Sequence, residues 1–300
     1  MKKIVIAGGS GFVGQALIRE FKKEFEIVIL GRSSKNLRHA RSVVWDARNL
    51  GPWAEELEGA AAVINLTGEP IAQRLNDDVM ARLLSSRVDS TVVLADALEK
   101  TQNPPPVWVN ASAIGIYGET GDRETSEGGA LGPAGHYLTR ICKAWEEAVQ
   151  IRSLPQTRRV ILRIGLVLGP EGGLLEKMVK LARSGLGGRA GSGEQYMSWI
   201  HQSDLARMMR WAIENPVEGV FNGTAPSPVT NEVFMAEVRR AVRAIWSPPA
   251  PEAAIRLAMK VTGMDPELVL RSQRIVPARA TGLGFQFEFP KLRAALEDLL

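Results

Sequence analysis

The sequence predicts an α/β protein of Rossmann type, with a doubly wound parallel sheet and a smaller mixed C-terminal lobe on the substrate side. Short runs of Val, Ile and Leu alternate with helical patterns, which is typical of strands buried on both faces of a parallel sheet. The first run enters a helix through a glycine-rich loop, IVIAGGSGFVGQAL at residues 4–17. The 300 residues, 45% of them hydrophobic, are enough for a sizeable core.

The predicted elements alternate regularly along the first half of the chain. Continuous apolar runs predict strands at Ile4–Ala7, Ile27–Leu30, Val43–Trp45, Ala62–Leu66, Val107–Ala111 and Val160–Ile164. Amphipathic patterns predict helices near residues 12–24, 52–58, 77–100, 136–151, 172–184 and 203–214. After about residue 165 the predicted strands and helices no longer alternate regularly. We therefore predict a nucleotide-binding domain over residues 1–165, to which later segments can return, and a lobe over 166–300.

Composition favours a globular protein and is compatible with an anionic small ligand. The formal net charge is +4, and the basic stretch RSSKNLRHAR at 32–41 lacks interleaved aromatic residues, so no nucleic-acid partner is expected. The apolar run after Met1 ends at Ala7, too short for a signal peptide, and no run reaches the roughly 20 apolar residues of a membrane span. Cys142 is the one cysteine, which fits either a reducing cytoplasm or simply a fold that needs no disulfide. Neither a metal-binding motif nor clustered histidines are found, so no metal is predicted.

The glycine loop predicts a phosphate-binding site at the start of the first helix. Gly8 permits a tight turn, Gly11 permits close approach of a pyrophosphate, and Gly14 permits the helix to pack on the strand. The helix N-terminus adds free N–H groups and partial positive charge. The alternative is a glycine-rich turn without a ligand. The loop residues predicted to bind a cofactor are Gly8, Ser10, Gly11, Phe12, Val13 and Gly14.

The spacing G-x-x-G-x-x-G resembles the extended, epimerase-like branch of the short-chain dehydrogenase/reductase superfamily. Further segments resemble a subgroup of that branch with a C-terminal domain of unknown function, here at about residues 248–296: NLTGEPI (65–71), SSRVDST (85–91), SAIGIYG (112–118), WIHQSDLA (199–206), NGTAPSPVTNEVF (222–234) and GFQFEFPKLRAAL (284–296). The resemblance covers essentially the whole chain. It implies a nicotinamide dinucleotide and hydride transfer on a small carbonyl or hydroxyl substrate, as in an oxidoreductase or epimerase.

The end of the second strand predicts NADP(H) in preference to NAD(H). NAD binders usually place a carboxylate there, whereas this chain has Gly31 and then Arg32, whose guanidinium can hold a 2′-phosphate. Lys35 and Arg38 add positive charge. The alternative is a solvated basic loop. The resemblance further places Asp46 near the adenine, unless it is an ordinary cap, and places four more residues along the cofactor: Leu66, Thr67, Gly68 and Arg87.

The resemblance also implies a catalytic Ser or Thr, a Tyr, and a Lys four residues after the Tyr, and this chain departs from that pattern twice. Ala113 occupies the usual hydroxyl position, one residue after Ser112. Tyr137 is followed four residues later by Ile141, while Arg140 shares the face of Tyr137. Arginine can lower the pKa of a tyrosine but cannot exchange protons. Either Tyr137 and Arg140 form a substitute pair, or Tyr137 only packs near the nicotinamide.

Three weaker candidates lie near the expected substrate pocket. Tyr117 ends the fifth-strand segment and is kept as a candidate catalytic residue. His201 is predicted either to touch ligand or to be a structural histidine, with Asp204 as a cap. Arg163 is expected to be buried and to need a partner, either substrate or a backbone carbonyl. The rival function is a non-catalytic NADPH sensor. By resemblance, a homodimer is expected to pair through helices 77–100 and 136–151.

Overall fold

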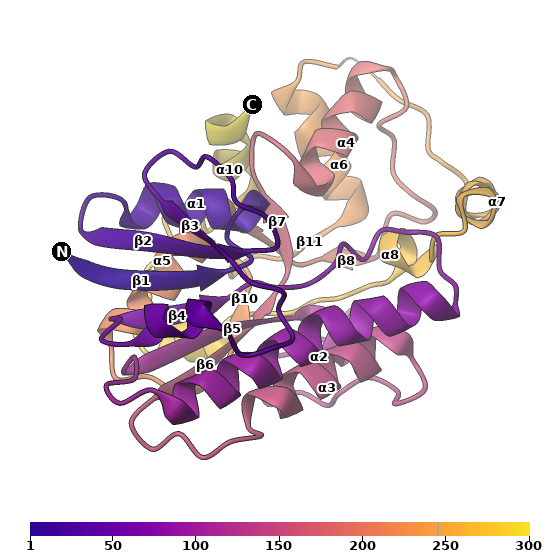
Figure 1. Ribbon diagram of the computed structural model, residues 1–300. Coiled ribbons are helices and arrows are strands. Elements are labelled where there is room, and N and C mark those ends of the chain that lie inside the picture. The colour runs from indigo at the N-terminus through magenta and orange to yellow at the C-terminus, as the bar shows by residue number, and fades with distance from the viewer. Residues whose placement is uncertain (245) are drawn as a thin grey trace.

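The protein is built on one seven-stranded parallel sheet, seen in a computed structural model that describes residues 1–244 and 246–300 (Figure 1). Neighbouring strands run parallel in the order β3-β2-β1-β4-β5-β6-β10. The predicted Rossmann-type fold is therefore confirmed. The strands are β1 (Lys2–Ala7), β2 (Phe25–Gly31), β3 (Arg41–Val44), β4 (Ala62–Asn65), β5 (Val107–Ala113), β6 (Arg158–Ile164) and β10 (Gly219–Gly223).

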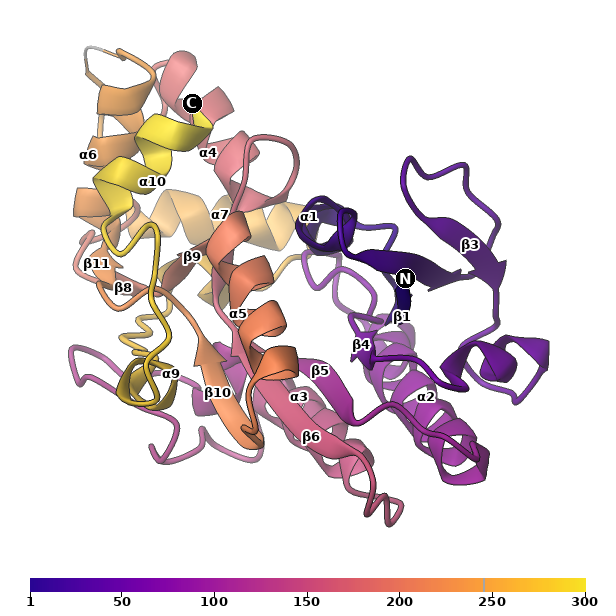
Figure 2. The ribbon, with the colours of Figure 1, turned by 90° about the vertical axis from the view of Figure 1, so that its left-hand side faces the viewer.

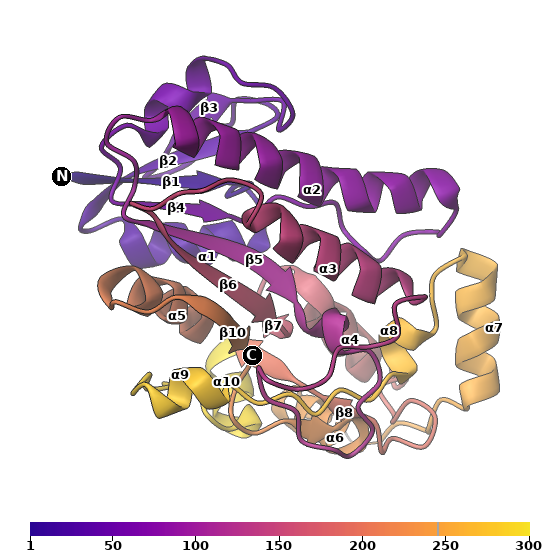
Figure 3. The same ribbon diagram turned by 90° about the horizontal axis from the view of Figure 1, so that it is seen from below.

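Helices cover both faces of this sheet, as in other doubly wound folds (Figures 2 and 3). One face carries α1 (Phe12–Phe21) and α5 (Gln202–Glu214). The other carries α2 (Asp77–Lys100), α3 (Tyr137–Val149) and the short helix η1 (Pro52–Leu57). The chain order reverses between β1 and β4, so ligands are expected outside the carboxyl ends of these two strands.

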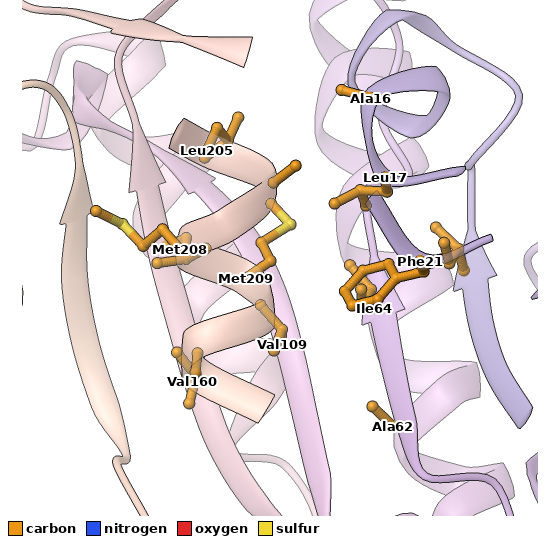
Figure 4. Close-up of a cluster of buried hydrophobic side chains, with 14 of the residues drawn as sticks. Ala16, Leu17, Phe21, Ala62, Ile64, Val109, Val160, Leu205, Met208 and Met209 are labelled. Carbon is orange, nitrogen blue, oxygen red and sulfur yellow. The ribbon is translucent and has the colours of Figure 1, made fainter. Parts of the chain in front are cut away.

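The helical pattern of α5 shows how the sequence fixes its packing (Figure 4). Its buried residues Leu205, Met208, Met209 and Ala212 follow the spacing i, i+3, i+4, i+7, which gathers them on one side of the helix. They share a core with side chains from α1 and the sheet, among them Ile64.

Several predicted boundaries shift by a few residues, and the strands after β6 were not predicted. The strand expected to end at Trp45 ends at Val44, and the Trp45 ring packs 5.0 Å from Trp53 in the core. The helix expected near 52–58 is a 3-10 helix that begins at Pro52. β10 joins the sheet beside β6, although glycine at both of its ends hides it from an apolar-run criterion.

A smaller lobe packs at the carboxyl edge of the sheet (Figure 1). Two short strand pairs form there, β7 (Leu166–Leu168) with β9 (Trp199–His201) and β8 (Tyr196–Met197) with β11 (Val229–Thr230). Its core is shared by α4 (Gly173–Arg183), α6 (Asn231–Ala241) and α10 (Leu292–Leu299). The remaining helices are η2 (Ile114–Tyr117), α7 (Glu252–Thr262), α8 (Glu267–Leu270) and α9 (Ala278–Gly282).

The chain after α8 crosses back to the sheet domain through residues 271–276. Gln273 donates from its amide to the backbone oxygens of Ile114 and Gly118, both at 2.9 Å. Its own carbonyl accepts from the Ser198 hydroxyl at 2.7 Å. Residues 271–276 are therefore tied to both the sheet domain and the lobe. In the part of the chain that the structure describes, no helix has the length and apolar character needed to cross a bilayer.

Truncation of a buried leucine of α5 is expected to destabilise the fold. Leu205 is fully buried, so Leu205→Ala should lower the free energy of unfolding by about 2–5 kcal/mol in urea titrations, through lost contacts and a cavity. Leu257→Ala on α7 is the matched control, because Leu257 is 65% exposed and its loss should cost about 0.5 kcal/mol or less. Equal costs for the two variants would contradict this packing.

Candidate functional site

The three glycines of the first loop have different reasons to lack a side chain. Gly8 has φ +73° and donates from its N–H to the oxygen of Leu30 at 2.9 Å. A Cβ at Gly14 would lie 1.9 Å from the oxygen of Gly9, so only glycine lets α1 start there. At Gly11 the nearest protein atom to such a Cβ would be 3.9 Å away. The fold thus needs Gly8 and Gly14, whereas the open space at Gly11 suits a ligand.

The N-terminus of α1 has the features that favour anion binding at a helix start. Gly11 caps the helix without a side-chain hydrogen bond, and the first turn contains no acidic residue. The N–H groups of Phe12, Val13 and Gly14 have no acceptor within the helix, because the first turn of any helix lacks one. Free N–H groups and the helix dipole together attract phosphate.

One basic residue after β2 contacts the loop that leads into this N-terminus. The Lys35 ammonium lies 3.3 Å from the hydroxyl of Ser10, inside the glycine loop. Arg32 is exposed, and its side chain has no hydrogen bond or ion pair to any other described residue. The structure therefore brings Lys35 and Ser10 together. The sequence indicates only diffuse positive charge at Lys35, since its contact with Ser10 depends on how the loop folds.

Asp46 follows β3 and uses its carboxylate within its own loop. The oxygens accept from the backbone N–H groups of Arg48 and Asn49 at 2.9 and 2.8 Å, and from the Asn49 amide at 2.7 Å. These hydrogen bonds, that from the Asn49 side chain first, lower the pKa of Asp46 to about 2. Asp46 is thus ionised and stabilises a turn on the β3 side of the site.

Leu66, Thr67 and Gly68 leave the end of β4 next to the buried side chain of Arg87. The Arg87 guanidinium donates to the backbone oxygens of Leu83 and Glu69, each at 2.9 Å. Among the described residues no carboxylate forms an ion pair with it. Burial accordingly lowers the pKa of Arg87. A buried cation without a carboxylate partner suits an anionic or polar ligand beside β4.

Two further features surround this turn. The side-chain oxygen of Asn65 accepts from the Thr67 N–H at 3.0 Å and so fixes the first bend. The Thr67 hydroxyl is buried and has no partner within residues 1–244 and 246–300. A Cβ on Gly68 would lie 3.0 Å from Cζ of Arg87, so a larger residue there would press on the guanidinium.

Tyr137 begins α3, and its hydroxyl is buried without a hydrogen-bond partner in the described chain. Burial raises the pKa of this phenol, Asp265 raises it further, and Arg271 acts in the opposite direction. Arg140 is exposed, and its side chain contacts no acceptor among the described residues. The structure therefore brings Tyr137 together with Asp265 and Arg271 from the C-terminal segment, rather than with Arg140.

Ser112 and Tyr117 belong to a buried hydrogen-bonded chain. The Ser112 hydroxyl donates to Glu146 at 2.7 Å, and both Glu146 oxygens accept from Arg163, at 2.9 and 2.8 Å. Arg163 also donates to the Tyr117 hydroxyl, which in turn donates to the Asn222 side chain, both at 2.8 Å. Burial raises the pKa of Tyr117, opposed by Arg163. Both predicted hydroxyls are thus held by protein groups.

The main partner of Arg163 differs from the two that the sequence suggested. The backbone oxygen of Glu127 accepts a hydrogen bond from Arg163 at 3.4 Å, which matches the expected backbone carbonyl partner. The closer partner is the carboxylate of Glu146, with both side chains nearly buried. Glu146 was missed because a glutamate in the run AWEEA of α3 is not distinguishable from a surface residue until the helix face is known.

The side chains of His201 and Asp204, two other candidates, are held by other protein groups. His201 caps α5, hydrogen-bonds the Ser203 hydroxyl at 2.6 Å, and stacks 4.0 Å from the Phe289 ring. Asp204 is fully buried and accepts hydrogen bonds from two backbone N–H groups of the C-terminal segment, both at 2.8 Å.

Burial raises the pKa of Cys142 to about 12, so this thiol is a poor nucleophile. No three potential metal-ligating side chains gather among the described residues.

The parallel sheet, the strand order and the glycine loop define an NAD(P)-binding protein of the extended short-chain dehydrogenase/reductase class. The chain belongs to the NAD-dependent epimerase/dehydratase family, whose model matches residues 4–224. A C-terminal domain of unknown function, DUF1731, matches residues 250–299. The resemblance inferred from the sequence is therefore confirmed, including the presence of a C-terminal domain of unknown function.

Similar proteins are found in distant organisms. The mouse epimerase family protein SDR39U1 is 34% identical over 315 residues, which cover 99% of each chain. A chloroplastic homologue from Arabidopsis thaliana is 30% identical and covers 99% of this chain and 86% of its own. The crystal structure of human SDR39U1 with NADPH superposes with a TM-score of 0.88 at 32% identity, over 99% of this chain and 98% of that one.

Removal of Arg163 is expected to destabilise the protein strongly. Arg163→Leu leaves the Glu146 carboxylate buried and unpaired, so the free energy of unfolding should fall by about 3–5 kcal/mol in urea titrations. The double variant Arg163→Leu/Glu146→Leu should recover part of this loss, because no unpaired charge remains. A double variant that loses the sum of both single effects would show that the pair is not coupled.

Proposed function

We propose that this chain binds NADP(H) in preference to NAD(H) and transfers hydride between this cofactor and a small carbonyl or hydroxyl substrate. One observation carries the proposal: the N-terminus of α1 is unobstructed at Gly11, lacks acidic residues, and has Lys35 beside it. The human relative whose crystal structure contains NADPH supports the cofactor.

The residues present suit each part of this dinucleotide. The N–H groups at Phe12 to Gly14 would hold the pyrophosphate. Arg32 and Lys35, with Ser10, would hold the 2′-phosphate, since a carboxylate that would repel it is absent from the end of β2. The nicotinamide half would lie along Leu66–Gly68, where the unpartnered Thr67 hydroxyl and the buried Arg87 offer donors. Asp46 would border the adenine.

The cofactor would supply or accept the hydride, and the chain would move the proton. We assign that proton to Tyr137, because its buried hydroxyl is free of protein partners in the described chain. Ser112 and Tyr117 would shape the pocket floor through Glu146 and Arg163. Arg140 has no role in this scheme, because its side chain is exposed.

A second candidate is an NADPH-binding sensor without turnover. It is favoured by Ala113 at the usual hydroxyl position and Ile141 at the usual lysine position. The two functions are separated by following NADPH absorbance with 9,10-phenanthrenequinone, aldehydes, ketones and nucleotide sugars. Turnover that Tyr137→Phe abolishes, with NADPH affinity retained, supports the enzyme. NADPH binding without any turnover supports the sensor.

We also propose a homodimer that pairs through α2 and α3, and residence in a reducing cytoplasm. The first rests on the resemblance to extended family members, and the second on a single cysteine, Cys142, which is buried. Light scattering on the purified chain tests the dimer, and a monomer at micromolar concentration would contradict it.

Filling the space at Gly11 is expected to block the cofactor without disturbing the fold. Gly11→Leu should raise the Kd for NADPH at least about tenfold, roughly 1.4 kcal/mol, with the far-ultraviolet circular dichroism unchanged. Gly128→Leu is the matched control, because no protein atom lies within 4 Å of a Cβ at that exposed glycine. Fluorescence titration measures both. An unchanged Kd in Gly11→Leu would contradict the proposed site.

Reversing the charge of Arg32 is expected to change the choice between the two dinucleotides. Arg32→Glu should weaken NADPH about 10- to 100-fold, because a charge-assisted contact to the 2′-phosphate is lost, and should leave NADH nearly unaffected. Arg38→Glu, in the same loop, makes the same change in charge and should affect NADPH much less. The ratio of the two dissociation constants is the readout, and equal effects of the two variants would refute a local phosphate contact.

A further inference from the structure

The C-terminal domain places two charged residues at the N-terminus of α3. Asp265 lies just before α8 and Arg271 just after it, and α8 lies near the start of α3 (Figures 1 and 3). The Arg271 guanidinium lies 2.5 Å from Nε2 of His136. The His136 ring is 4.9 Å from the ring of Tyr137. The proposed catalytic tyrosine is thus bordered by residues of DUF1731.

These residues are held in place on both sides. Oδ1 of Asp265 accepts from the backbone N–H of Glu267 at 2.9 Å. Ser272, next to Arg271, donates from its N–H to Glu119 and accepts at its carbonyl from Thr120, both at 2.9 Å. The position of Asp265 and Arg271 is therefore part of the fold.

Two buried polar atoms at this place lack partners. They are the hydroxyl of Tyr137 and Oδ2 of Asp265, and neither has a hydrogen bond within the described residues. A phenol donates one hydrogen bond and a carboxylate accepts, so the two groups are complementary. Buried polar groups in folded proteins are almost always satisfied, which indicates that these two act on each other or on a ligand between them.

We propose that Asp265 is the proton acceptor for Tyr137, so that the C-terminal domain supplies the acid–base partner that this chain lacks at position 141. The inference rests on the proposed function and adds a residue to it.

The proton and electron balance is complete with these groups. When a substrate alcohol is oxidised, its carbon gives a hydride to NADP⁺, its hydroxyl proton passes to the Tyr137 oxygen, and the proton of Tyr137 passes to Oδ2 of Asp265. The C–O single bond becomes C=O. Reduction runs in reverse, from protonated Asp265 and NADPH. Such a relay needs no free phenolate, because Tyr137 gains one proton as it loses another.

The charges around Tyr137 fit a relay better than a free phenolate. Burial and Asp265 both raise the pKa of Tyr137, so the phenol keeps its proton at neutral pH. Arg271 opposes this shift. Burial and Arg271 lower the pKa of His136, against Asp265 and Glu267, so the imidazole adds no positive charge at neutral pH.

A fluorinated tyrosine at position 137 tests the pairing directly. 3,5-Difluorotyrosine, whose phenol is more acidic than that of tyrosine, is placed there by stop-codon suppression, and its ionisation is followed by fluorine NMR. Asp265→Asn should lower the midpoint by about one pH unit or more, because a nearby negative charge is lost. Asp265→Ser removes the same charge and gives a second reading, while Asp265→Glu should keep the midpoint high.

Glu267→Gln is the matched control, two residues further along, where the carboxylate pairs with Arg256 instead. Its midpoint should stay within about a third of a pH unit of the starting protein. Equal midpoints in the starting protein and in Asp265→Asn would overturn the pairing.

Kinetics with 9,10-phenanthrenequinone and NADPH test the role in proton transfer. Asp265→Asn should lower kcat at least tenfold and leave the Kd for NADPH unchanged, whereas an unchanged kcat would overturn that role. Failure of the proposed function would instead show as a chain that does not bind NADPH at all, while the NMR midpoints are still measurable.

Discussion

The close packing of Gly14 against the Gly9 carbonyl is the constraint on which the site depends. It lets α1 begin directly at the end of β1, at the place where the strand order reverses between β1 and β4. The free N–H groups of α1 therefore lie at the carboxyl edge of the sheet, where Lys35 contacts the glycine loop and Asn65 fixes the turn after β4. A side chain at residue 14 would move the helix and separate these groups.

A second constraint explains why the pocket departs from the pattern of the superfamily. The chain from Ser112 through Glu146, Arg163 and Tyr117 to Asn222 joins β5, α3, β6, η2 and β10. These hydrogen bonds link β10, which follows lobe segments in the chain, to the rest of the sheet. The hydroxyls of Ser112 and Tyr117, both predicted to be catalytic, are hydrogen-bonded within this chain of side chains. The charged neighbours of Tyr137 come from the C-terminal domain instead.

The sequence predicts those structural features that depend on residues close together in the chain. β1, β2, β4, β5 and β6 are largely buried, so runs of apolar residues indicate them, and the spacing of the glycines alone identifies the glycine loop. β10 was not predicted, because Gly219 and Gly223 flank only three residues and its stability comes from pairing with β6. Glu146 and Asp265 were missed for a similar reason. Their partners lie on other elements, and only the folded chain brings them together.

A crystal structure of this chain grown with NADPH is the most direct measurement. The pyrophosphate should accept hydrogen bonds from N–H groups at the start of α1, the 2′-phosphate should lie against Arg32 and Lys35, and the nicotinamide ring should lie near the Tyr137 hydroxyl. A dinucleotide bound at another place, or a nicotinamide ring on the far side of the sheet from Tyr137, would contradict the site described by this fold.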